Sequence, residues 1–274
     1  MINLVVALAA ESRPLIDHFR LREDRSVTGF RVYRNGDIRL IVTGMGRVAC
    51  AAGTAVVGEA RDDAAAAAWL NIGIAGHASH PVGEGVHALN IIDAASGRRW
   101  YPVQIVSLAG CGETVCTVDA PETGYREPHV YDMEASAFYA TALRYATGEL
   151  IQVYKIISDN RARGVETVDR GGIRRAVSEH IPAIEAMVEG LSGLAAEAAA
   201  SQPRLPEIDH ILRRWHFTVA QQHRLRELMR RWEILHHGEP VLDAELNRCP
   251  SAKAFLGELS DRLAVVYRRG EGRN

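Results

Sequence analysis

Three acidic side chains stand where the chain passes from one predicted element to the next. Glu11 follows an apolar run at residues 2–8, and Asp159 follows another at 150–157. Glu134 lies near the start of a helical pattern that precedes the second run. Active sites in α/β proteins gather at the carboxyl ends of strands, where carboxyl groups serve as general acids and bases. We therefore expect these three carboxyl groups to converge on one pocket.

Further candidates follow the same strand ends or flank the three acids. Some are small residues, which let a substrate approach the backbone closely, and others carry a polar or thioether group. The candidates for substrate contact are Met45, Gly46, Ala75, Gly76, His77, Met133, Lys155 and Ser158.

The elements that must position these residues can be read from hydrophobic periodicity. Strand-length apolar runs occur at 2–8, 30–34, 38–43, 68–72, 86–92, 103–107, 114–118 and 150–157. Helical patterns occur at 12–20, 48–62, 132–147 and 172–199. Asn35-Gly36 is a strong hairpin signal. Buried strands that alternate with helices indicate an α/β fold with a mixed, mostly parallel central sheet flanked by helices.

The pattern changes near residue 200. Prolines at 203 and 206 predict a linker, and residues 205–270 have helical patterns without strand runs. We therefore predict an α/β domain at 1–199 and an all-helical C-terminal extension at 200–274, with two to four helices.

Net charge, cysteine spacing and apolar runs reduce the number of function classes that fit the chain. The 274 residues carry a net charge of −2 at a pI near 6.6, which does not favour nucleic acid as a partner. The four cysteines have no metal-binding or disulfide spacing, and no run is long and apolar enough to span a membrane. The first apolar run lacks the basic residues that begin a signal peptide. We expect a cytoplasmic protein that has no membrane partner.

Several motifs occur in a characteristic order. They are VALAAESRPLI (6–16), TGMGRVACAAGTA (43–55), NIGIAGH (71–77), VGEGV (82–86), YDMEASAF (131–138) and VYKIISDN (153–160). Together they resemble the methylthioadenosine/S-adenosylhomocysteine nucleosidase branch of the nucleoside phosphorylase superfamily. The resemblance covers roughly residues 1–195, and its specific part is the pairing of DMEASA with IISDN.

The resemblance implies hydrolysis of the N-glycosidic bond of an adenine nucleoside modified at the 5′ position, without cofactor or metal. Asp159 would protonate the leaving base, with support from Ser158, and Glu11 would take a proton from the attacking water. Glu134 would hold the ribose hydroxyls and face an oxocarbenium-like transition state, with Met133 packed on the sugar. The resemblance also favours a homodimer.

The chain departs from the family pattern in three places. Lys155 stands where the family usually has arginine, and Ile74 where it usually has a hydroxyl residue. The segment between Asp93 and Asp132 is shorter than usual. The first two departures fall near the expected water and sugar, and the third affects the base pocket and the dimer contact.

Two other functions are compatible with the sequence. A phosphorylase would bind phosphate with clustered arginines, for which Arg13 and Arg47 are candidates, but the charge of Glu11 favours water as nucleophile. A nucleoside-binding or regulatory protein could use its arginine-rich C-terminal helices, which carry Trp215 and Trp232, to contact a partner. Packing of amphipathic helices is the favoured interpretation of that segment.

Each motif also has a structural interpretation. Asp159 could cap a helix, and Glu134 could interact with a helix dipole. Residues 44–49 fit a dinucleotide-binding GxGxxA pattern, but they follow the third predicted strand and not the first. Histidines at 77, 80 and 87 could bind a metal, although scattered loop histidines are the favoured interpretation.

Overall fold

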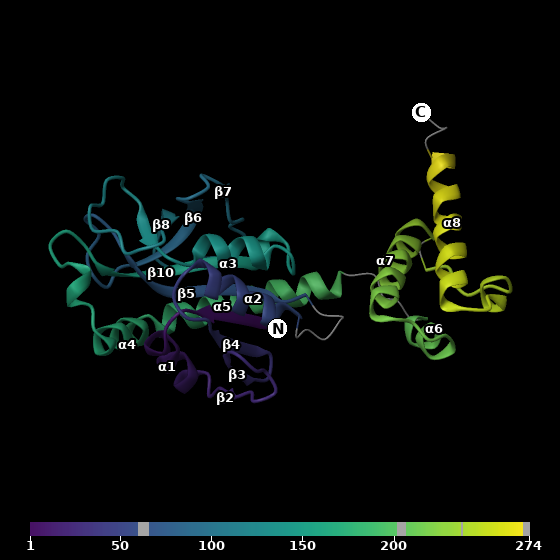
Figure 1. The fold of residues 1–274 in the computed structure, drawn as a ribbon, viewed down its shortest axis with the longest axis horizontal. Coiled ribbons are helices and arrows are strands. Elements are labelled where there is room, and N and C mark those ends of the chain that lie inside the picture. Colours follow the sequence, from purple (N-terminus) through teal and green to yellow (C-terminus); the bar gives the residue numbers. More distant parts are fainter. Residues whose placement is uncertain (60–65, 202–206, 237, 271–274) are drawn as a thin grey trace. The chain divides into compact units, whose positions relative to one another are not determined.

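The computed structural model describes residues 1–59, 66–201, 207–236 and 238–270, and side chains as far as residue 264. Contacts divide the chain into two compact units, Met1–Ala200 and Ser201–Asn274, each described by itself (Figure 1). None of the described helices is long and apolar enough to cross a membrane. The predicted linker lies mostly outside the described residues.

The first unit is built on one mixed sheet. Its strands are β1 (Ile2–Val6), β2 (Arg22–Glu23), β3 (Arg31–Asn35), β4 (Ile38–Val42), β5 (Ala68–Gly76), β6 (Gly85–Asp93), β7 (Arg99–Trp100), β8 (Cys111–Thr117), β9 (Val130–Asp132) and β10 (Ile151–Asp159). The order is β10-β6-β8-β9-β5-β1-β4-β3-β2, with β7 beside β6. β10 also pairs with β5, so β5, β10, β6, β8 and β9 close into a ring. The predicted mixed α/β fold is confirmed.

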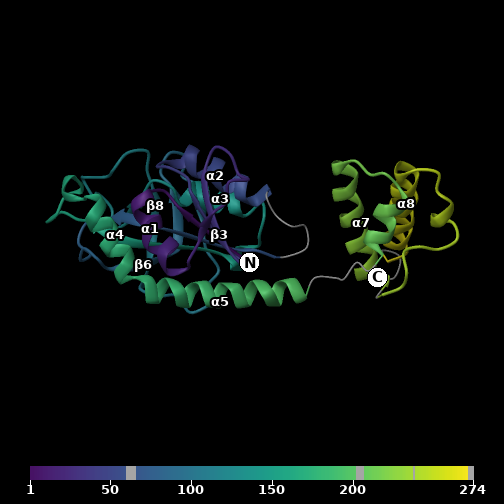
Figure 2. The same cartoon turned by 90° about the horizontal axis from the view of Figure 1, so that it is seen from below.

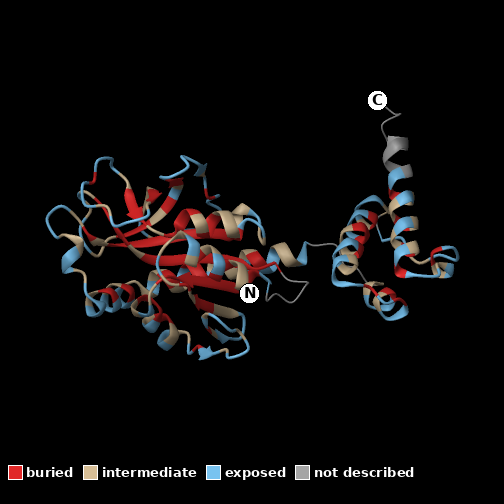
Figure 3. Cartoon of the chain, viewed as in Figure 1, coloured by how far each residue is buried: buried red, intermediate tan, exposed pale blue. Residues whose placement is uncertain are grey.

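Helices cover both faces of this sheet (Figure 2). Helices α1 (Ala9–His18), α4 (Arg170–Glu179) and α5 (Ile181–Ala200) pack on one face, and α2 (Arg47–Glu59) and α3 (Ala135–Ala142) on the other. Strand β1 illustrates this arrangement, because its side chains alternate between the two faces. Leu4 and Val6 face the first helix group, while Val5 faces the second. Strands buried on both faces require apolar side chains at successive positions, as the sequence has (Figure 3).

Two predicted elements are wrong in extent or type. Residues 103–107 form no strand, and Val103 and Ile105 are exposed by 47% and 58%. The helix predicted at 132–147 is confined to α3, because residues 130–132 form β9. The Asp132 carboxylate accepts hydrogen bonds from the N–H groups of Glu134 and Ala135, which starts the helix after the strand. The predicted end of the helix at 48–62 lies outside the described residues.

The second unit contains the predicted C-terminal helices, α6 (Ile208–Arg214), α7 (Val219–His236) and α8 (Ala252–Gly270). Trp215 and Trp232 are both only 9% exposed, within a cluster that includes Phe255. Each indole N–H donates to a backbone carbonyl, of Cys249 and of Glu239, at 3.0 Å. The tryptophans are therefore core residues of this unit and do not form an exposed stacking surface.

Candidate active site

A cavity of about 150 Å³ opens at the carboxyl ends of β1, β5 and β10. We call it the acid cavity, because three carboxyl groups predicted from the sequence line it. The predicted residues in its wall are Glu11, Met45, Ala75, Gly76, Met133, Glu134, Ser158 and Asp159. The wall therefore combines residues that are far apart in the sequence, from Ala7 to Val165.

Glu11 lies in the first turn of α1, and its carboxylate is held by the backbone. One oxygen accepts hydrogen bonds from the N–H groups of Ala7 and Leu8 at 3.0 and 2.7 Å, and the other from Ile74 at 3.0 Å. The side chain is buried, and this burial raises its pKa. A carboxylate that is both fixed and more basic than usual can accept a proton from a neighbouring molecule.

Glu134 is the N-cap residue of α3, but its side chain makes no capping hydrogen bond. Its Oε1 instead accepts a 2.7 Å hydrogen bond from the Gly46 N–H, which comes from the loop after β4. Burial raises the pKa of the Glu134 carboxyl to about 7. This N–H is directed at a carboxylate and is therefore not available to a dinucleotide phosphate.

Asp159 ends β10, in a position that caps no helix. The Tyr125 hydroxyl donates to its Oδ2 at 2.5 Å, and the Ser158 hydroxyl to its Oδ1 at 2.6 Å. A Cβ on Gly76 would lie 2.6 Å from Oδ2, so only glycine leaves room for this carboxyl group. Tyr125 was not predicted, since it lies in an irregular stretch without periodicity.

Lys155 does not line the acid cavity but lies behind its wall. Its ammonium is 2.8 Å from Asp132 Oδ2, with the side chains 1% and 0% exposed. Burial alone would lower the pKa of Lys155, but the carboxylates of Asp132 and Glu134 raise it above its ordinary value. A Cβ on Gly73 would lie 3.1 Å from Glu11 Oε1 and 3.4 Å from Lys155 Nζ, so both groups approach the same glycine.

Asp132 is the second functional residue that the sequence analysis missed. Besides Lys155, it binds the Thr117 hydroxyl at 2.7 Å, and both residues are buried. The available signal was an acid two positions before Glu134 in the YDMEASAF motif. The resulting network places one ammonium among three carboxyl groups, those of Glu11, Asp132 and Glu134.

His77 follows β5 but is not among the residues that line the acid cavity. Its Nδ1 accepts hydrogen bonds from the backbone N–H groups of Ser79 and His80, at 3.2 and 2.9 Å. Burial lowers its pKa, which favours the neutral ring that these bonds require. Its observed contacts stabilise the turn between β5 and β6.

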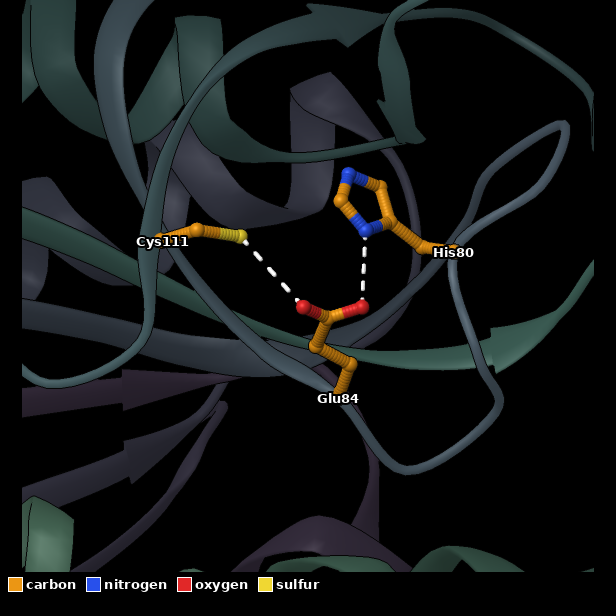
Figure 4. A group of neighbouring side chains, drawn as sticks. All are labelled: His80, Glu84 and Cys111. Atoms are coloured by element: carbon orange, nitrogen blue, oxygen red, sulfur yellow. Dashed lines mark hydrogen bonds and ion pairs between the residues drawn. The ribbon is translucent and has the colours of Figure 1, made fainter.

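One group of side chains near that turn has the chemistry of metal ligands. Ligand atoms of His80, Glu84 and Cys111 lie within 4.8 Å of one another (Figure 4). His80 also pairs with two carboxylates, through Nδ1 with Glu84 at 2.7 Å and through Nε2 with Glu113 at 3.0 Å. Burial would lower the pKa of His80, but its hydrogen bonds to the two carboxylates raise it. Hydrogen bonds of His80 and Cys111 to carboxylates hold this cluster together and join the turn to β8.

The two arginines considered for phosphate differ in their surroundings. Arg47 Nη1 donates to both carboxylate oxygens of Asp93, at 3.0 and 2.8 Å, and Nη2 pairs with Asp119 at 2.6 Å. Among the residues that the structure describes, Arg13 pairs only with the exposed Asp17 on the next turn of α1. The guanidinium of Arg47 is therefore occupied by two carboxylates, whereas the side chain of Arg13 is exposed to solvent.

The raised pKa of Glu134 predicts a pH-dependent stability. An unfolded chain releases this proton near its ordinary value of 4.5, whereas the folded protein retains it to about 7. The native state therefore loses stability as pH rises through this window, by about 3 kcal/mol for a shift of this size. In urea unfolding at pH 5 and pH 8, we expect Glu134→Gln to remove most of this loss. An equal pH dependence in both proteins would contradict the assignment.

Comparison with known proteins identifies the fold. No family model and no curated protein sequence matches the chain. Among solved structures, the 5′-methylthioadenosine/S-adenosylhomocysteine nucleosidase of Helicobacter pylori matches with a TM-score of 0.57 at 13% identity, over 69% of this chain and 97% of that one. The corresponding enzyme of S. pneumoniae gives 0.56 at 18%, over 69% and 99%. A futalosine hydrolase mutant of Helicobacter pylori gives 0.56 at 12%, over 69% and 98%. The chain thus has the nucleosidase fold that its motifs predicted.

Proposed function

We propose that this protein hydrolyses the N-glycosidic bond of an adenine nucleoside, one that is modified at the 5′ position, and releases adenine. The observation that carries the proposal is the meeting of Glu11, Glu134 and Asp159 in one cavity, supported by a buried lysine. The solved nucleosidases with this fold support the same class of reaction.

The departing base determines the first half of the mechanism. The C1′–N9 bond breaks and its electrons move into the purine, which then needs a proton. Asp159 enters this step as a protonated carboxyl group, oriented by the hydroxyls of Tyr125 and Ser158, gives its proton to N7 and becomes a carboxylate. General-acid catalysis of this kind contributes about 10²–10⁴-fold to a rate.

The ribose determines the second half. Positive charge grows on C1′ as the base leaves, and a water oxygen bonds to C1′ while Glu11 takes the proton that this water releases. Glu134 accepts hydrogen bonds from the ribose hydroxyls. When Glu11 and Glu134 are ionised, they and Asp132 outnumber the single ammonium of Lys155, and this negative charge stabilises a cationic transition state.

Water is favoured over phosphate as the nucleophile by the charges at the site. Glu11 would repel a phosphate ion placed beside C1′, and Arg47, one of two candidate phosphate ligands, is bound by Asp93 and Asp119. Methylthioadenosine and S-adenosylhomocysteine are the substrate types that we would test first. The homodimer and the cytoplasmic location stay predictions.

The proposal is tested by adenine release, measured by chromatography, from methylthioadenosine, S-adenosylhomocysteine, 5′-deoxyadenosine and adenosine. Each is incubated with and without phosphate. We expect free adenine without phosphate and none from the Glu11→Gln protein. Release that requires phosphate would assign a phosphorylase, and release from none of the four would contradict the proposal.

A further inference from the structure

A second hollow adjoins the acid cavity and differs from it in charge. This hollow, of about 540 Å³, is lined by Arg13, Arg31, Arg170 and Arg174, together with residues 8–10. We call it the basic pocket. Leu8 lines both hollows, so they are neighbours on either side of one side chain.

The arginines come from three elements that the fold brings together. Arg13 lies on α1, Arg31 begins β3, and Arg170 and Arg174 lie one turn apart on α4. Within the described part of the chain, no carboxylate pairs with Arg31, Arg170 or Arg174, and Arg13 has only the exposed Asp17. All four arginines are exposed, so solvent screens part of their mutual repulsion, and their planar donors are free to bind carboxylate or phosphate oxygens.

The order of the strands shows on which side of the expected adenine position, beside Asp159, the basic pocket lies. Asp159 ends β10, and the neighbouring strands from there are β5, β1, β4 and β3. Glu11 and Leu8 follow β1, and Arg31 faces Val42 at the carboxyl end of β4. A line from Asp159 thus passes Glu11 and Leu8 before it reaches Arg31.

A nucleoside placed on this line has its base at Asp159 and its reacting C1′ at Glu11. The part of the ribose most distant from the base is its 5′ carbon, which then points past Leu8. We propose that the basic pocket binds a negatively charged group carried at the 5′ position of the substrate, and so selects anionic over neutral 5′ substituents. This inference rests on the proposed function for the identity and orientation of the nucleoside.

The test compares two nearly isosteric substrates that differ in charge. These are 5′-S-(2-carboxyethyl)-5′-thioadenosine and its primary amide, assayed by adenine release at low ionic strength. We expect kcat/KM to be at least about tenfold higher for the carboxylate, and the ratio to fall with added salt because exposed charges are screened. In the Arg31→Gln/Arg170→Gln protein the ratio should fall to about one. Arg25→Gln, an exposed arginine outside both hollows, should keep the wild-type ratio.

Two results would overturn the inference, and the first of them leaves the proposed function intact. One is an equal kcat/KM for the two substrates in the wild-type protein. Another is stimulation of amide turnover by inorganic phosphate that the double variant loses, because the arginines would then bind a co-substrate. If neither substrate releases adenine, the proposed function fails. The ratio of their dissociation constants, measured by calorimetry on wild-type and variant protein, then decides whether the basic pocket recognises the anion.

Discussion

The Asp159→Asn protein is expected to release adenine about 10³-fold more slowly than wild type at neutral pH, a loss within the range for a general acid. An amide keeps the shape of the side chain and can still bind the Tyr125 and Ser158 hydroxyls, but it has no proton to give to N7. The effect should fall mainly on kcat, measured by chromatography of adenine under saturating substrate.

Two controls make this result specific. Asp24→Asn changes a carboxylate that is bound to Ser26 outside the acid cavity, and should leave kcat within twofold of wild type, as expected for a remote site. Circular dichroism of the Asp159→Asn protein should match that of wild type. Retention of a tenth or more of the wild-type kcat would mean that another group protonates the base. Retained binding of a macromolecular partner with no turnover in either protein would favour a regulatory role.

The Lys155→Met protein is expected to lose about 3–5 kcal/mol of the free energy of unfolding at pH 8, as when one partner of a buried ion pair is removed. The ammonium and its partner Asp132 are both buried, so the change leaves uncompensated carboxylates beside Glu11 and Glu134. The loss should be smaller at pH 5.5. Without the cation the pKa values of Glu11 and Glu134 rise further, and protonated carboxyl groups are tolerated at low pH. Urea unfolding at the two pH values measures both effects.

Matched variants separate charge from packing at this position. Lys155→Arg keeps the charge and should retain most of the stability, whereas Lys253→Met removes an exposed lysine of the second unit and should change little. Adding Asp132→Asn to Lys155→Met should recover part of the lost stability, because the two residues are coupled. Equal losses in the Arg and Met proteins would show that the shape of the lysine matters and its charge does not.

Much of the fold follows from local sequence patterns. Strands β1 and β10 are buried at nearly every position because both faces of the sheet are covered, and the apolar residues that this burial favours are visible without a structure. The segment at 103–107 has a similar pattern but forms no strand. Its alternating apolar residues satisfy the strand pattern, yet Val103 and Ile105 are exposed in a loop.

The candidate site was less completely predictable, because its contacts join distant parts of the chain. Glu11, Glu134 and Asp159 belong to motifs and could be named in advance. Tyr125 binds Asp159 across 34 positions, from a loop with no periodic pattern. Lys155 was predicted to contact substrate, but its position behind the cavity wall depends on pairing with Asp132, which the strand pattern alone does not reveal.

The ring of β5, β10, β6, β8 and β9 has a consequence for how copies of this protein can meet. A strand in a closed ring has a hydrogen-bonded neighbour on each side, so it offers no unpaired edge to another chain. Among the described strands, the open edges of the sheet are β2 and β7, which have two residues each, and Arg22, Glu23 and Arg99 on them are charged and exposed. Short charged edges resist strand-to-strand association. Any assembly of the first unit is therefore expected to use helix and loop surfaces, and the sheet itself is protected against the edge pairing that leads to aggregation.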